Sequence, residues 1–280
     1  MYAAVLTILF ALSSSEDARE ILDKAIDVQQ GARPREEIRD LFFSCDLHIN
    51  EGDSTTNIGM DQYYKNAGKR SRDDKIVTLV EDDLNAKKKG ELQEGYNGSD
   101  FWVKNGDEVT ILGKDPVWDQ SKKDIRGRLR MIQTFRRIFF LANLSQEIRP
   151  IRRLDGEKDE LRIEARPNEP TAWGVEKLEL TFDAKTYLLE KATIYPLEAR
   201  ENDGLVLETD PPATSPAQRL VDDVTHIDFL NYDRRLSESG LAVPEKVLVR
   251  QNSSNRWIRL EIFKFEFNQD YPDSRFDPPR

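Results

Sequence analysis

The chain lacks most of the residues from which proteins build metal sites and nucleophilic active sites. It contains one cysteine, Cys45, and two histidines, His48 and His226, in 280 residues. A single cysteine excludes an internal disulfide. On a strand, Cys45 and His48 point to opposite faces because their separation is odd, so they do not form a metal pair. We expect Cys45, which follows the apolar segment 41–43, to be a buried strand thiol.

The sequence motifs of the common enzyme classes are also missing. There is no glycine-rich phosphate loop, no Gly-x-Ser-x-Gly, no Cys-x-x-Cys and no His-Glu-x-x-His. The acidic pairs at 82–83 and 222–223 lie beside loops, and nothing in the pattern favours two carboxylates facing each other across a cleft. We therefore expect a protein that is not an enzyme and that uses no metal and no cofactor.

Basic charge is in short supply. The 42 Lys and Arg residues face 52 Asp and Glu residues, which gives a net charge of −10. Broad nucleic-acid binding requires a basic surface, so we expect no nucleic-acid partner. A charged fraction of 34% is typical of a soluble protein with long charged loops, and the clear apolar periodicity argues against disorder.

Hydrophobic runs long enough to span a membrane are absent. The apolar run 3–12 is too short to cross as a helix, and small residues at 13–15 followed by charge complete a pattern typical of a secretory signal peptide. The usual basic residues before the run are missing. We predict a signal peptide over 1–13 and a periplasmic or secreted protein. The alternative is an N-terminal hydrophobic helix of the fold.

The remainder indicates one α+β domain over 14–280 with a loop insertion at 200–218. An amphipathic helix is predicted over 14–31, ending at Gly31, and a second over 124–144. A charged loop is predicted over 81–94. Alternating residues predict strands over 38–50, 59–72, 75–80, 160–165, 177–183, 188–195, 225–232, 245–250 and 257–267, and a hairpin over 95–112 with its turn at Asn105-Gly106.

The last predicted strand carries large apolar residues at both its even-numbered and its odd-numbered positions, which point to opposite faces. One parity holds Ile258, Leu260 and Ile262, and the other holds Trp257, Phe263, Phe265 and Phe267. Such a strand either has two faces to bury, or has one face packed and one lining an apolar cavity. The second possibility would make the protein a carrier of apolar ligands.

The helix over 124–144 is both basic and strongly apolar, and three interpretations stay open. It packs on the sheet with its arginines reaching solvent. Alternatively, the segment 128–144 lies on an anionic membrane surface. In the third interpretation the helix is a lid over an apolar cavity and contacts the ligand.

In the order of its elements the chain resembles the LolA/LolB-like superfamily of bacterial periplasmic lipoprotein carriers. The matching features are the exported N-terminus, the first helix, the segment Tyr96-x-Gly98-x-x-x-Trp102, the central helix, Asp228-Phe-Leu-Asn-Tyr232, Gly240-Leu-Ala-Val-Pro244, Phe-x-Phe-Asn268 and Phe276-Asp-Pro-Pro279. The chain departs from these carriers in its length and in the loops at 81–94 and 200–218.

The resemblance implies a large curved antiparallel sheet that forms an incomplete, half-open β-barrel, with helices covering the concave side. It implies a non-catalytic exported binding protein that holds a lipid or lipoprotein acyl chains in an apolar cavity. The alternative is an envelope sensor or scaffold of the same fold that binds a protein partner. By apolarity and expected face, the candidate ligand-binding residues are Trp102, Met131, Ile132, Phe135, Phe139, Trp257, Phe263 and Phe265.

Overall fold

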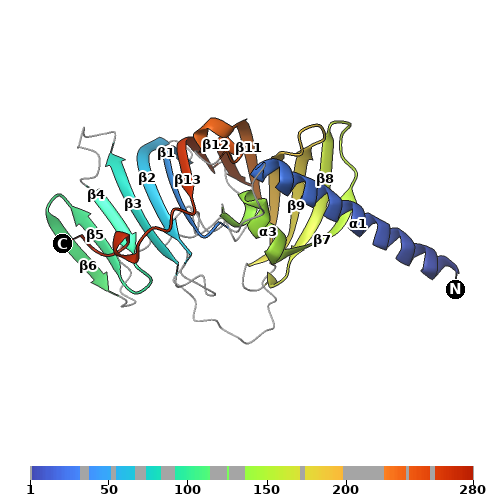
Figure 1. The fold of residues 1–280 in the computed structure, drawn as a ribbon, viewed down its shortest axis with the longest axis horizontal. Helices are drawn as coiled ribbons and strands as arrows, with labels where there is room; N and C mark the ends of the chain where they lie inside the picture. Colours follow the sequence, from blue (N-terminus) through green and yellow to red (C-terminus); the bar gives the residue numbers. More distant parts are fainter. Residues whose placement is uncertain are drawn as a thin grey trace.

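The computed structural model describes residues 2–31, 38–51, 55–66, 74–82, 92–113, 125, 136–170, 174–197, 224–237, 240–252 and 256–279. Across these ranges, 13 strands form one antiparallel sheet whose ends do not meet. The helices α1 (Tyr2–Gln30) and α3 (Leu141–Glu147) lie against one face of it (Figure 1), which we call the inner face. The expected α+β half-open barrel is confirmed.

The sheet consists of two meanders that meet in the middle. The first meander contains β1 (Asp40–Glu51), β2 (Thr55–Lys65), β3 (Lys75–Asp82), β4 (Leu92–Tyr96), β5 (Phe101–Asn105) and β6 (Glu108–Gly113), and the second contains β7 (Ile148–Leu154), β8 (Glu160–Pro167), β9 (Val175–Asp183), β10 (Leu189–Pro196), β11 (Thr225–Asp233), β12 (Val243–Gln251) and β13 (Arg256–Phe267). The strand order is β6 to β1, then β13 down to β7. The last strand therefore pairs with the first and joins the two meanders.

Each strand expected from the sequence overlaps a strand of the sheet. The hairpin turn is displaced by one residue, because Asn105 pairs with Glu108 and Gly106 supplies the positive φ of 60°. Strand β7 was not predicted. It carries Pro150 and several arginines, which mark an edge strand and hide its alternation.

A β-bulge in β13 overturns the expectation that its aromatic residues share one face. Ser44 of β1 pairs with Lys264 while Cys45 pairs with Ile262, so Phe263 is an extra residue without a partner in the register. The extra residue reverses the alternation beyond it. Consequently Ile258, Leu260 and Ile262 share the inner face with Phe265 and Phe267, whereas Trp257 and Phe263 point outward.

The first helix covers the second meander. The predicted stripe is confirmed: Ala18, Leu22, Ala25 and Ile26 are buried against the inner face, where α1 contacts β7 and β8. Gly31 ends the helix with φ 68°, and its N–H donates to the carbonyl of Asp27 at 2.9 Å, as expected for a glycine cap. The helix begins at Tyr2 and not near 14, so it extends beyond the edge of the sheet (Figure 1).

The prediction for the single cysteine is confirmed. Cys45 is 1% exposed on the inner face of β1, and burial raises the pKa of its thiol above the ordinary range. His48 lies on the outer face, where its Nδ1 contacts Asn57 Oδ1 at 2.6 Å. The two side chains therefore do not meet. Within the described part of the chain, no group of His, Cys, Asp and Glu could hold a metal ion.

Because of the bulge, we predict different effects for Phe263 and Phe265, which simple alternation would place on the same face. Phe265→Ala should lower the free energy of unfolding by about 3–5 kcal/mol, because it opens a cavity beside buried Phe140. Phe263→Ala should cost no more than about 0.5 kcal/mol, because its side chain is 56% exposed. Urea unfolding of both variants measures the difference. Equal losses would show that the two phenylalanines share one face and that the bulge is absent.

Candidate functional site

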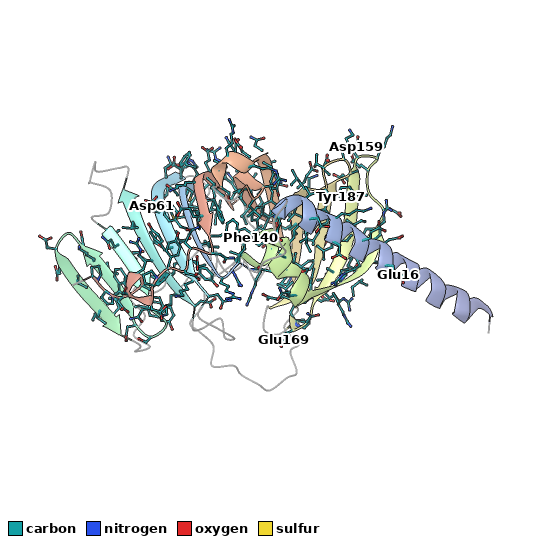
Figure 2. The ribbon with its side chains drawn as sticks, viewed as in Figure 1. Glu16, Asp61, Phe140, Asp159, Glu169 and Tyr187 are labelled. Carbon is teal, nitrogen blue, oxygen red and sulfur yellow. The ribbon has the colours of Figure 1, made fainter. Side chains whose placement is uncertain are left out.

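The described part of the central helix ends in an aromatic cluster on the inner face. Residues 136–139 are helical, Phe140 is extended with φ −82° and ψ 94°, and α3 begins at Leu141. The ring of Phe139 lies 5.6 Å from that of Phe229, and the ring of Phe140 lies 5.5 Å from that of Phe265. Figure 2 shows Phe140 near the middle of the molecule beside α3. Between 136 and 144 only Arg137 is not buried, which favours packing on the sheet for this part of the helix.

A buried side chain from α1 bridges the break in this helix. Gln29 Nε2 donates to the carbonyl of Phe139 at 2.7 Å, and the Leu141 N–H donates to Gln29 Oε1 at 3.0 Å. Gln29 is only 3% exposed. The amide therefore satisfies the Phe139 carbonyl and the Leu141 N–H, the backbone groups on either side of the extended Phe140.

Two further side chains tie the same segment to the chain entering β1. Asn143 accepts from the Ile38 N–H at 2.8 Å and donates to the Ile38 carbonyl at 3.1 Å. Arg136 Nε donates to the same carbonyl at 2.8 Å. Because all these groups are buried, losing one partner leaves another unsatisfied. The segment 136–147 is thus fixed to the inner face by polar contacts as well as by aromatic packing.

Close to Arg136, a buried phenol faces a carboxylate. Tyr64 of β2 donates to Asp74 Oδ2 at 2.6 Å, and the Arg136 guanidinium lies 6.0 Å from the Tyr64 ring. Burial raises the pKa of Tyr64 well above its ordinary value, and the negative charge of Asp74 adds to this effect. The phenol therefore stays neutral and acts as a hydrogen-bond donor, with no role as a base at neutral pH.

The inner face of β2–β6 carries apolar side chains that are only partly buried. We call these the inner apolar surface: Ile58, Leu92, Tyr96, Val103 and Leu112. Tyr96 stacks on Phe101 with ring centroids 4.4 Å apart. In contrast, the outer face of the second meander carries ion pairs such as Arg162 with Glu179 at 3.1 Å. Apolar area that keeps partial contact with water on an inner face is suited to binding an apolar ligand.

The structure does not gather the sequence-predicted ligand-binding residues into one place. Phe139 and Phe265 are buried in the aromatic cluster on the inner face. Trp257 and Phe263 lie on the outer face of β13, and Trp102 lies on the outer face of β5. Met131, Ile132 and Phe135 lie outside the described residues.

The inner apolar surface was missed because alternation does not say which parity of a strand faces inward. On β5, for example, Phe101 faces inward and its neighbour Trp102 outward. Tyr96 pairs with Phe101, and Val103 lies two residues after Phe101 on the same strand, so all three side chains point to one face. Once one of them is known to face inward, this register identifies the other two.

Trp102 is packed beneath the C-terminal strap, which we define as residues 268–279. Its indole N–H donates to the Phe276 carbonyl at 3.0 Å, and its ring lies against Gly95 of β4. Phe276 is fully buried beside Trp102 and Val77. The two motifs that carried part of the family resemblance, around Trp102 and around Phe276, are therefore in direct contact.

Charged groups hold the strap along the outer face of the first meander. Asp273 accepts from Lys65 at 2.8 Å and lies 3.0 Å from the Lys75 ammonium group, and these cations lower the pKa of its carboxyl. At the start of the strap, Asp40 accepts the N–H groups of Gln269 and Asp270. Burial nevertheless raises the pKa of Asp40. The strap thus covers the back of the strands whose inner face carries the inner apolar surface.

Comparison with known proteins bears on the fold. No family model matches the chain, and no curated protein matches it in sequence. A solved DUF1329 family protein from Desulfovibrio piger is similar with a TM-score of 0.53 at 12% identity, over 93% of this chain and 97% of that one. A LolA superfamily protein from Nitrosomonas europaea is similar with a TM-score of 0.51 at 14% identity, again over 93% and 97%. The chain has a LolA/LolB-like fold.

The contact between Gly95 and Trp102 predicts a sharp steric effect. Gly95→Ala would place a Cβ 2.4 Å from Trp102 Cε2, so the indole must move and its bond to Phe276 must weaken. We expect a loss of roughly 1–3 kcal/mol in the free energy of unfolding. In a Trp102→Leu background the same change should cost much less, which a double-mutant cycle by urea unfolding measures. Equal costs in both backgrounds would rule out this contact.

Proposed function

We propose that this chain is a non-catalytic, exported binding protein that holds a lipid or the acyl chains of a lipoprotein against the inner apolar surface. The observation that carries the proposal is the partial exposure of Ile58, Leu92, Tyr96, Val103 and Leu112 on the inner face of a half-open barrel. The LolA/LolB-like fold supports it, since a curved open sheet has an interior that side chains need not fill.

The binding energy for such a ligand needs no catalytic group. Each methylene transferred from water to an apolar surface contributes about 0.8 kcal/mol, so an acyl chain can bind by burial alone. The partly exposed side chains of the inner apolar surface gain the same kind of stabilisation when the ligand covers them.

The proposed compartment is the periplasm or the exterior of the cell, with residues 1–13 as the signal peptide. The apolar run 3–12 followed by small residues supports this. Among the described helices, none has the length and apolarity that crossing a membrane requires. Contact of the segment 128–144 with a membrane surface is a further prediction, and two of its four basic residues, Arg128 and Arg130, lie outside the described ranges.

A second candidate function is an envelope sensor or scaffold that binds a protein partner. Two apolar side chains on the outer face favour it: Phe263 of β13 is 56% exposed and Leu230 of β11 is 44% exposed. The dense aromatic packing around Phe139 and Phe140 also favours it, because those residues form core. The insertion 200–218, the predicted contact segment, lies outside the described residues.

Lipid uptake by the delipidated protein tests the first candidate. We expect native mass spectrometry to show a stoichiometric adduct with fatty acid or phospholipid. Val103→Asp should weaken binding at least tenfold, about 1.4 kcal/mol, because it places a carboxylate on the inner apolar surface. The control is Ile111→Asp on the adjacent strand β6, where the side chain is 61% exposed and points outward.

The control variant should bind as the wild type does, and circular dichroism should show both variants folded. Wild-type protein that takes up no lipid would contradict the carrier function and favour the protein-binding candidate. Equal loss of binding in both variants would place the ligand elsewhere.

A further inference from the structure

A row of buried polar side chains crosses the inner face of the first meander. Gln62 of β2 pairs in register with Thr78 of β3, and Thr78 pairs with Glu94 of β4. The three side chains are 0%, 2% and 8% exposed. The row interrupts an otherwise apolar face, since the next inward residues on β2 and β3 include Met60, Tyr64, Ile76 and Val80.

The amide of Gln62 is incompletely satisfied. Its Nε2 donates to Thr78 Oγ1 at 3.1 Å, whereas its Oε1 is buried and accepts no hydrogen bond from the residues that the structure describes. Buried polar atoms are normally paired, and an unpaired one is costly enough to require an explanation. A methionine of similar length would fill the same space without this cost. The position of Gln62 between apolar neighbours on the inner face therefore suggests a ligand that supplies the missing partner.

We propose that Gln62, held by Thr78, is a specificity-determining residue that selects amphiphiles carrying a hydrogen-bond donor next to the acyl chain. The donor is a hydroxyl or an amide N–H, which Gln62 Oε1 accepts. This inference rests on the proposed lipid-binding function and adds to it the polar chemistry of the ligand. Plain hydrocarbon would contact the same apolar side chains but leave Gln62 Oε1 unpaired.

The Gln62–Thr78 pair is suited to a neutral polar group. The two members that hydrogen-bond each other, Gln62 and Thr78, are uncharged, and Gln62 is anchored by its own Nε2. An anchored amide presents its acceptor in one direction, so little conformational freedom is lost when the ligand binds. A ligand without the donor gains nothing at this position, because the buried acceptor then stays unpaired.

The test compares two probes with one acyl chain, monopalmitoylglycerol and methyl palmitate, of which only the first donates hydrogen bonds. Affinities are measured by competition with a fluorescent fatty acid. The wild type should prefer monopalmitoylglycerol about tenfold, and Gln62→Met should bring the ratio close to one while methyl palmitate still binds. The matched control is Gln93→Met, because Gln93 precedes Glu94 on β4 and lies on the outer face. It should keep the wild-type ratio.

The outcomes separate the role of Gln62 from lipid binding itself. An unchanged ratio in Gln62→Met, or equal affinities in the wild type, would overturn the role of Gln62 while leaving lipid binding intact. Binding of neither probe to the wild type would remove the proposed function itself. If Gln62→Met fails to fold, Thr78→Val serves instead: it removes the group that anchors Gln62, so the preference should fall to about threefold, and an unchanged preference would overturn the proposal.

Discussion

The pairing of the last strand with the first is the constraint on which the rest of the structure depends. Strands β1 and β13 join two meanders that would otherwise be separate sheets. The bulge at Phe263 decides which side chains of β13 face inward along its full length. Because of that bulge, the ring of Phe265 contacts the ring of Phe140, and this contact holds the helix break before α3 against the inner face.

The inner face is divided into two regions with different properties. Around Phe139 and Phe140, rings and buried amides such as Gln29 close the interior against α1 and α3. On β2–β6 the apolar side chains keep partial contact with water, and a polar row runs between them. The first region is a stable core that positions the second, which has the properties of a binding surface. The strap on the outer face supports the same strands from behind.

The sequence predicts the class of fold and nearly all strands, because alternation and turn residues are local signals. It cannot predict the bulge, since one extra residue leaves no local mark and Phe263 resembles Phe265 in every respect but position. The same limit applies to the ligand-binding residues. Phe139 and Phe265 face inward but are buried in the core, and Trp102 faces outward beneath the strap. Tyr96 and Val103, which do line the inner apolar surface, were not among the predicted residues. Their facing depends on register with distant strands.

The central claim is that the half-open barrel carries an acyl-chain ligand in its natural compartment. Native mass spectrometry of the protein purified from its own source without detergent, followed by lipid extraction, tests this claim most directly. The account predicts a stoichiometric lipid mass that disappears on extraction and returns when lipid is added. A clean mass of the unliganded chain, with no uptake of added lipid, would contradict it and show that the inner face is only a core.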